Sequence, residues 1–350
     1  MIPPKMKALV VTGEKTIEVQ EFSVPQPAPG EILIRLEHCL ICTWEQRIFQ
    51  NGDGMKMPFL PGHEASGVVA WVPEGTPTSF REGDPVVVKT LDSCGHCEFC
   101  YRGLDNQCVG TPKKRFYDGV PGSGGMAQYI ALPVSRVFPL PDPNCDLREA
   151  AFAEPVACCL RSLEQADLQF GEDVVIVGGG IMGQLHNVLA KKRGTRTILV
   201  EMDPARAALA TRMGADEIVD PSACDPILRI KELTCGRGAN VVFITAPIPQ
   251  LAELYLDALD KVGRIVYYTS FSPNTPISIS PKSLHYSEKK IMGSYSPTSQ
   301  GFYTAARLLG RRIIDVRPFL TETYPMSEAY TAFTRSMSAE TLRVGIDLWK

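Results

Sequence analysis

Four cysteines stand close together in the sequence, at a spacing typical of a metal site. Cys94, Cys97, Cys100 and Cys108 form the pattern C-x2-C-x2-C-x7-C, in a stretch interrupted by two glycines. Four thiolates complete a tetrahedral shell around Zn²⁺ and leave no position open for a substrate. The pattern therefore predicts a closed, structural zinc site in a lobe at about residues 92–110. An iron–sulfur cluster is the alternative, because C-x2-C-x2-C also resembles ferredoxin spacing.

A second group of residues has the spacing of a dinucleotide-binding turn. The apolar run 174–177 predicts a strand buried on both faces, and Gly178, Gly180 and Gly183 follow it as G-x-G-x-x-G. These glycines permit a tight turn, close approach of a pyrophosphate and close packing of the predicted helix 181–192, whose N-terminus attracts the phosphates. The candidate dinucleotide-binding residues are Gly178, Gly180, Ile181, Met182, Gly183, Glu201, Arg206 and Thr245.

The acidic residue at the end of the second predicted strand of this region indicates which dinucleotide binds. Glu201 can accept both hydroxyl groups of the adenosine ribose, whereas a 2′-phosphate at ~4 Å would meet a like charge at a cost of roughly 4 kcal/mol. Asp203 precedes Pro204 and is predicted to cap a helix instead. Arg206 opposes this preference, since it could pair with a phosphate. The sequence predicts that NAD is favoured over NADP.

These candidate sites require two kinds of domain around them. Residues 1–155 are rich in short β-branched segments separated by glycine and proline, which predicts a β-rich domain. In residues 156–296, strands alternate with helices, which predicts right-handed βαβ units and a doubly wound parallel sheet. Residues 297–350 are predicted to return to the first domain. A β-rich domain combined with a doubly wound parallel sheet gives the fold class α/β. Strands are predicted at 5–11, 16–21, 31–38, 68–72, 85–88, 127–132, 174–177, 197–201, 217–219, 241–245, 264–268 and 290–294, and a further helix at 205–213.

Two further motifs give the chain a resemblance to a known family. Gly62-His63-Glu64 is similar to the G-H-E of zinc alcohol dehydrogenases, and residues 124–129 (GGMAQY) look like their G-G-F-A-E-Y stretch. Together with the cysteine lobe and the glycine motif, in that order along the chain, they resemble the zinc-dependent medium-chain dehydrogenase/reductase family over essentially the whole sequence. The resemblance implies a GroES-like catalytic domain, a Rossmann NAD-binding domain and a cleft between them.

The resemblance also implies a second, catalytic zinc ion. Its ligands would be Cys42, His63 and Glu154, with Glu64 beside them. Glu154 matches the branch of the family that has glutamate in place of cysteine, which includes sorbitol and threonine dehydrogenases. A mixed set of S, N and O ligands leaves one position open, and zinc lowers the pKa of water bound there to about 7. An alcohol in that position would be acidified similarly and could pass a hydride to NAD.

The residues after the zinc cysteine depart from the family pattern. Trp44 stands where the family has the Ser or Thr that starts a proton relay, a step worth roughly 10²–10⁴-fold in rate. Another group must replace it, and neither Thr43 nor Arg47 is established in that role. Glu45 replaces the usual Asp and is predicted to orient His63. Trp44 is predicted to stack on a ring substrate, with a position in the core as the alternative.

Composition and charge exclude several other classes. A chain of 350 residues with 44% hydrophobic residues, 21% charged residues and a net charge of −3 offers no electrostatic footprint for nucleic acid or anionic lipid. No apolar stretch approaches the ~20 residues needed to span a bilayer, and prolines near the N-terminus argue against a signal peptide. Eleven cysteines without an export signal favour a reducing compartment, so a cytoplasmic location is expected.

The expected activity is NAD-dependent, zinc-dependent oxidation of a secondary alcohol group on a polyol, sugar or cyclitol. A threonine or amino-alcohol dehydrogenase is a second enzyme hypothesis, since that branch shares Glu154. A zinc protein that senses NAD is the non-enzyme alternative. We also expect a homodimer or homotetramer that pairs through the predicted strand 290–294.

Overall fold

A computed structural model describes residues 2–50, 54–110, 115–271 and 273–350. The chain forms two compact units, one made of Met1–Ala157 with Thr298–Lys350 and the other of Cys158–Pro297. Within the described ranges, no helix combines the length and the apolar character needed to cross a bilayer.

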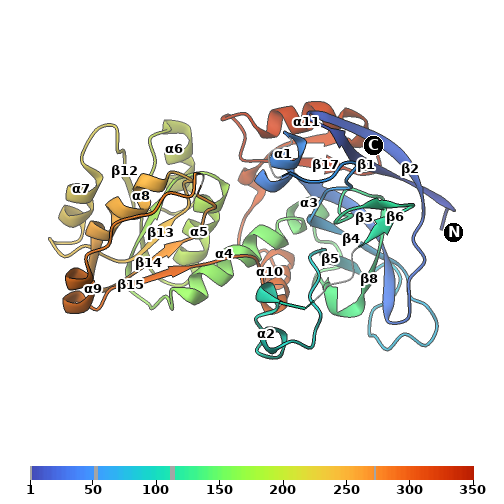
Figure 1. The fold of residues 1–350 in the computed structure, drawn as a ribbon, viewed down its shortest axis with the longest axis horizontal. Helices are drawn as coiled ribbons and strands as arrows, with labels where there is room; N and C mark the ends of the chain where they lie inside the picture. Colours follow the sequence, from blue (N-terminus) through green and yellow to red (C-terminus); the bar gives the residue numbers. More distant parts are fainter. Residues whose placement is uncertain (1, 51–53, 111–114, 272) are drawn as a thin grey trace. The chain divides into compact units, whose positions relative to one another are not determined.

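The first unit is built on a seven-stranded sheet whose centre is β3 (Figure 1). One edge of β3 pairs with β4, and the other pairs with β8 along its first half and with β17 along its second half. The sheet order is β16-β17-β3-β4-β5-β9, and β1–β2 and β6–β7 are separate two-stranded ribbons. The strands are β1 (Lys5–Gly13), β2 (Thr16–Ser23), β3 (Glu31–Leu40), β4 (Glu64–Trp71), β5 (Pro85–Lys89), β6 (Phe116–Tyr117), β7 (Val120–Pro121), β8 (Tyr129–Pro133), β9 (Val137–Pro139), β16 (Leu320–Pro325) and β17 (Arg343–Asp347).

The alternation of side chains along β3 explains why this sheet is covered on both faces. Ile32, Ile34 and Leu36 are buried in one hydrophobic cluster, while Leu33 is buried in another, which it shares with Val10 of β1. Because successive side chains of a strand point to opposite faces, both faces of β3 need a covering layer. The helices of this unit are α1 (Thr43–Phe49), α2 (Glu98–Tyr101), α3 (Leu147–Ala150), α10 (Ser299–Gly310) and α11 (Ala329–Ser336), with single turns η1 (Asp105–Gln107), η2 (Val134–Arg136), η4 (Arg317–Phe319) and η5 (Met326–Glu328); α4 (Ala153–Gln165) begins here and ends in the second unit.

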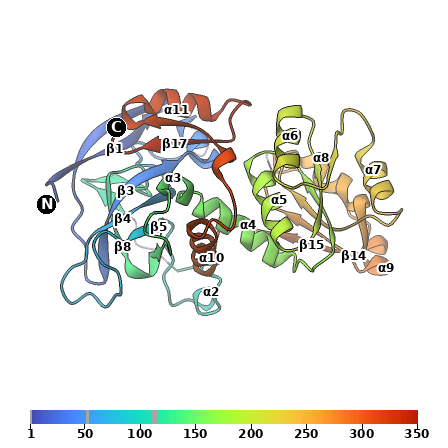
Figure 2. The same ribbon diagram turned by 180° about the vertical axis from the view of Figure 1, so that it is seen from behind.

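The second unit contains a six-stranded, fully parallel sheet in the order β12-β11-β10-β13-β14-β15. Figure 2 shows α5 and α6 over one face of the sheet, and Figure 1 shows α8 and α9 over the opposite face. Its elements are β10 (Asp173–Val177), α5 (Ile181–Lys192), β11 (Arg196–Val200), α6 (Pro204–Arg212), β12 (Glu217–Val219), α7 (Pro226–Leu233), β13 (Ala239–Ile244), α8 (Pro249–Leu254), η3 (Tyr255–Ala258), β14 (Leu259–Tyr267), α9 (Pro281–Ser287) and β15 (Lys290–Gly293).

The order of strands in this sheet fixes where a ligand can bind. β10 lies between β11 and β13, so the strand order reverses on either side of it. Doubly wound sheets bind ligands beyond the carboxyl ends of their strands at this point, and Gly178 follows β10 directly. The α/β fold class with a β-rich domain and a Rossmann domain is confirmed. The limits of α5 and β12 agree with the prediction, whereas the sequence does not predict α1.

Candidate functional site

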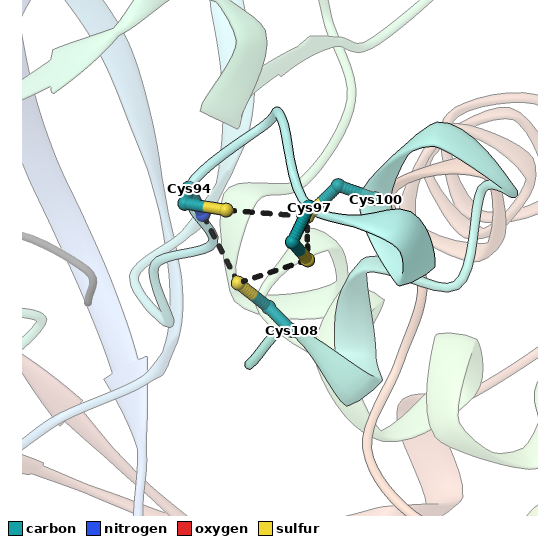
Figure 3. A group of neighbouring side chains, drawn as sticks. All are labelled: Cys94, Cys97, Cys100 and Cys108. Atoms are coloured by element: carbon teal, nitrogen blue, oxygen red, sulfur yellow. Dashed lines mark hydrogen bonds between the residues drawn. The ribbon is translucent and has the colours of Figure 1, made fainter. Parts of the chain in front are cut away.

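The four cysteines of the lobe converge on one point, as Figure 3 shows. The distances between Sγ atoms are 4.0 Å for Cys94–Cys100, 3.5 Å for Cys97–Cys100 and 3.9 Å for Cys97–Cys108. A tetrahedral Zn²⁺ site with ~2.3 Å bonds places its sulfur atoms about 3.8 Å apart. The arrangement of these thiols therefore fits a single zinc ion with four sulfur ligands.

Backbone groups around the lobe favour the thiolate form of two of these cysteines. Hydrogen bonds from the N–H groups of Cys100 and Val109 lower the pKa of Cys97 to about 6. The N–H of Cys94 donates to Sγ of Cys108 at 3.2 Å and lowers the pKa of Cys108. Burial raises the pKa of Cys100 to about 11. Metal ligation requires thiolates, so the N–H groups prepare part of the site before a metal binds.

Polar contacts hold the base of the lobe in place. Asp105 forms an ion pair with the buried Lys89 of β5. The same carboxylate accepts hydrogen bonds from the N–H and the hydroxyl of Ser299, at 2.9 and 2.6 Å, at the start of α10. Arg136 donates to the carbonyl groups of Leu91 and Ser93, just before the first cysteine. The lobe is thus joined to three separate elements of the first unit.

The second candidate metal site joins the start of α1 to the start of β4. One ligand atom each of Cys42, His63 and Glu64 lies within 4.8 Å of the other two. His63 and Glu64 are buried, whereas Cys42 is half-buried at the N-cap of α1. Thiolate, imidazole and carboxylate are the ligand types of catalytic zinc sites, so the donor set fits this metal.

Close backbone contact between two motifs positions the histidine. Gly62 has φ +102°, and a Cβ atom on it would lie 2.4 Å from the backbone nitrogen of Met126. The N–H of Gly125 donates to the carbonyl of Gly62 at 3.0 Å. The G-H-E motif and the GGMAQY segment are therefore two sides of one backbone contact, which explains why both contain glycine.

Glu45 connects the ligands to one another. Its Oε1 lies 2.6 Å from Nδ1 of His63 and accepts the N–H of Gly62, while its Oε2 accepts the N–H of Cys42. Burial disfavours the charged form of His63, but Glu45 and Cys42 together outweigh it and raise the pKa of His63 well above its usual value. This contact occupies Nδ1 and leaves Nε2 to bind a metal.

The structure adds a residue that the sequence reasoning missed. Arg343, at the start of β17, donates from Nε and Nη2 to the two carboxylate oxygens of Glu64 at 3.0 and 2.5 Å, and both side chains are buried. Burial raises the pKa of Glu64, and Arg343 opposes this shift. No local pattern could have identified Arg343, because 278 residues separate it from Glu64 in the sequence and only the fold brings the two together.

Glu154 lies near this centre without joining the group of converging ligands. It is the second residue of α4 and is buried, and its charge raises the pKa of Glu64 and that of Arg343. At this centre, the ligand atoms that converge within 4.8 Å are those of Cys42, His63 and Glu64.

Trp44 lies beside the histidine, half-buried. Its ring is 5.5 Å from the His63 ring and 5.8 Å from that of Phe59, edge-on in both cases. It also packs in a small hydrophobic cluster with Ile48 of the same helix. Thr43, the first residue of α1, is exposed. The Trp44 side chain therefore both packs in a hydrophobic cluster and borders the candidate metal site.

The glycine turn has the geometry that its sequence predicts. Gly178 has φ +102°, and a Cβ atom on Gly183 would lie 1.8 Å from the carbonyl oxygen of Gly178. A Cβ atom on Gly180 would meet nothing within 4 Å, so the backbone is open to a ligand at the N-cap of α5. Ile181 and Met182 form the first turn of this helix and are half-buried. These features fit a pyrophosphate at the helix N-terminus.

Glu201 lies against this turn with its carboxylate held by the backbone. Oε2 accepts the N–H of Gly179 at 2.7 Å, and Oε1 accepts those of Met202 and Asp203, both at 2.8 Å. Asp203 caps α6 by accepting the N–H of Arg206, as predicted. The hydroxyl of Thr245 donates to the carbonyls of Val177 and Gly178, so it supports the turn. The half-buried Arg206 lies in the first turn of α6.

Comparisons with known proteins find relatives for both units of the chain. The chain matches the family models "Alcohol dehydrogenase GroES-like domain" over residues 28–142 and "Zinc-binding dehydrogenase" over residues 182–311. It is 32% identical to erythritol/L-threitol dehydrogenase of Mycolicibacterium smegmatis, over 79% of each chain. It is 28% identical to sorbitol dehydrogenase of Bacillus subtilis, over 96% of this chain and 95% of that protein. A solved structure from Sinorhizobium meliloti 1021, described as a zinc-binding dehydrogenase bound to NADP, has a TM-score of 0.89 and 25% identity, and the match covers 99% of this chain and 100% of that one.

The buried ion pair at the metal site makes a prediction about stability. We expect Arg343→Met to lower the free energy of unfolding by about 3–5 kcal/mol, because it leaves the Glu64 carboxylate buried without its guanidinium partner. Urea denaturation followed by circular dichroism measures the change. Arg317→Met is the matched control: it removes an exposed ion pair with Asp315 and should cost less than about 1 kcal/mol. Equal losses in the two variants would contradict this account.

Proposed function

Since this chain belongs to the zinc-dependent medium-chain dehydrogenase/reductase family, we propose that it oxidises a secondary alcohol group of a polyol, sugar or cyclitol to a ketone with NAD as the acceptor. The observation that carries the proposal is the convergence of Cys42, His63 and Glu64 in a unit that also has a separate four-cysteine lobe. One site has a mixed donor set suited to catalysis and the other has a closed set suited to structure. We therefore expect two zinc ions per chain.

The protein's own residues contribute positioning and charge balance. When bound, zinc lowers the pKa of the substrate hydroxyl group, and NAD accepts the hydride. Glu45 keeps the His63 ring in one orientation through Nδ1. Arg343 offsets the negative charge that Glu64 and Glu154 bring to the site. We propose Glu154 as a further ligand of this zinc, because it is buried and its charge acts on both Glu64 and Arg343.

The route by which the substrate proton leaves cannot begin at position 44, where this chain has Trp in place of the family's Ser or Thr. The indole N–H of Trp44 is only a donor and cannot accept a proton. Thr43 precedes Trp44 and is exposed. We propose Thr43 as the first proton acceptor on the protein, because a hydroxyl group can both accept and donate a proton.

The central test measures reduction of NAD by panels of polyols, sugars, cyclitols and amino alcohols, before and after treatment with a chelator. We expect activity on ring or chain polyols that a chelator removes and added Zn²⁺ restores.

Elemental analysis should find two zinc ions per chain. His63→Ala should lower kcat/KM more than ~100-fold with an unchanged far-UV spectrum, since it removes a ligand. Cys97→Ser should instead mainly lower the melting temperature. Active protein with one metal ion or none would contradict the two-site proposal.

Cofactor preference should depend on Glu201. We expect wild-type protein to favour NAD, because the carboxylate accepts the ribose hydroxyls and repels a 2′-phosphate. Glu201→Ser should relax this preference by at least roughly tenfold, as measured by kcat/KM for the two dinucleotides. Glu217→Ser, which alters a half-buried carboxylate paired with Arg196, is the control and should leave the preference unchanged. Equal kcat/KM values for NAD and NADP in wild-type protein would contradict the assignment.

Trp44 should influence the choice of substrate. An aromatic face beside the open position of the metal site favours the C–H-rich face of a ring substrate. We expect Trp44→Ser to weaken activity on a ring polyol and to improve activity on a small secondary alcohol, whereas Trp44→Phe should keep the wild-type order. A steady-state comparison of both substrates gives the answer. A proportional loss on both, together with lower stability, would show that Trp44 acts only in packing.

We also propose that the chain forms a homodimer or homotetramer through β15. This strand is the last of its sheet, and its outer edge has no paired strand among the described residues. Symmetric pairing across a two-fold axis would satisfy these backbone groups. Light scattering at micromolar concentration should give at least twice the chain mass of 38.4 kDa, and a monomer would contradict this.

A further inference from the structure

An unusual feature of α5 is that it buries two amide side chains against α6. Gln184 and Asn187 are both fully buried. Nε2 of Gln184 donates to the carbonyl of Gly179 at 3.1 Å and to the carbonyl of Arg206 at 2.9 Å. Burying an amide is costly unless its hydrogen bonds are made, and these two bonds satisfy Nε2, while Oε1 is buried without a hydrogen-bond partner among the described residues. Gln184 therefore joins the glycine turn to the first turn of α6.

The backbone of Gly179 is held on both sides of its Cα atom. Its carbonyl accepts from Gln184, and its N–H donates to Oε2 of Glu201 at 2.7 Å. A Cβ atom on Gly179 would lie 2.8 Å from Oε2 and 2.9 Å from Cγ of Glu201. Position 179 thus has no room for a side chain because the Glu201 carboxylate packs directly on its backbone. Gly179 therefore links Gln184 to Glu201 through the two peptide planes that meet at its Cα atom.

We propose that Gln184 is a positioning residue that sets the preference for NAD over NADP, by restricting the backbone of Gly179, whose N–H holds the Glu201 carboxylate. The inference rests on the proposed function, in which Glu201 discriminates between the two dinucleotides. Two of the three N–H groups that hold this carboxylate, those of Met202 and Asp203, come from its own turn. The third is the N–H of Gly179 in the glycine turn, and Gln184 holds the backbone of that residue through its carbonyl.

The physical reason is that discrimination requires a carboxylate that cannot move aside. A fixed negative charge beside the ribose rejects a 2′-phosphate, whereas a mobile one can turn away and relieve the repulsion. Without Gln184, the Gly179 carbonyl loses this partner, and the backbone of Gly179, which no side chain restricts, can shift together with its N–H group. Glu201 would then lose its N–H partner on the glycine turn, so NAD binds less tightly and NADP is rejected less strongly.

Asn187 provides a matched control on the same helix. Its Nδ2 donates to the carbonyls of Ala210 and Met213, both at 3.4 Å, and its Oδ1 accepts the hydroxyl of Thr197 at 2.8 Å. These partners lie at the other end of α6 and on β11, away from the glycine turn. Loss of the Asn187 amide should therefore affect packing and stability without reaching Glu201.

The experiment measures Kd for NAD and for NADP by calorimetric titration of the full-length protein, together with the melting temperature. Gln184→Met and Asn187→Leu replace each amide with an apolar side chain of similar shape. Gln184→Met should lower the ratio of Kd for NADP to Kd for NAD about tenfold, the equivalent of one lost hydrogen bond. Gly179→Ala, which pushes directly on the carboxylate, should lower the ratio as well. Asn187→Leu should lower the melting temperature and leave the ratio within about twofold of wild type.

The outcomes separate this inference from the proposed function. If wild-type protein prefers NAD and both Gln184→Met and Gln184→Leu keep the wild-type ratio, the role of Gln184 is wrong and the role of Glu201 stands. An equal fall of the ratio in Asn187→Leu would also overturn the inference, because a general loosening of α5 would then explain the effect. Wild-type protein without a preference for NAD would overturn the cofactor assignment itself, and the role of Gln184 with it.

Discussion

One buried carboxylate, that of Glu45, holds together the two segments that carry the candidate ligands of the catalytic metal. It accepts the N–H of Cys42 from the start of α1, the N–H of Gly62 before β4, and the Nδ1 atom of His63. Cys42 and His63 therefore have fixed positions before a metal binds. Ligands fixed in this way could not relocate to close around a bound ion, so this contact would preserve the open position that the proposed chemistry requires.

The C-terminal segment, which belongs to the first unit, brings a positive charge to the candidate metal site. The site contains the carboxylates of Glu45, Glu64 and Glu154 as well as the thiol of Cys42, and burying this many acidic groups is costly. Arg343 reaches the site from the last strand and donates to both oxygens of Glu64. Because β17 pairs with β3 directly beside the segment that leads to Cys42, the cation lies where the acidic groups gather. The sheet topology thereby supplies the charge balance of the site.

The parts of this structure that the sequence predicts are those whose geometry is local. The cysteine lobe spans fifteen residues and the glycine turn six, so spacing alone determines how their atoms converge. The limits of α5 follow from a glycine turn at one end and a change to a charged, glycine-containing segment at the other. Helix α1 escapes prediction because it has seven residues and a cysteine at its N-cap, and its buried Glu45 interrupts the apolar pattern. Arg343 and Gln184 act across the fold or through buried amide contacts, and no local pattern marks either of them.

A carboxylate that accepts backbone N–H groups holds three different loops of this protein. Glu45 fixes the segments before α1 and β4, Asp105 joins the cysteine lobe to α10, and Glu201 fixes the glycine turn. In each case the carboxylate accepts backbone N–H groups, which every residue except proline provides. Side-chain packing could not do this in a turn that must remain open to a dinucleotide or in a loop made mostly of metal ligands. The rigidity of both candidate sites therefore comes from charge-assisted hydrogen bonds to the backbone, and the apolar cores only determine where those carboxylates lie.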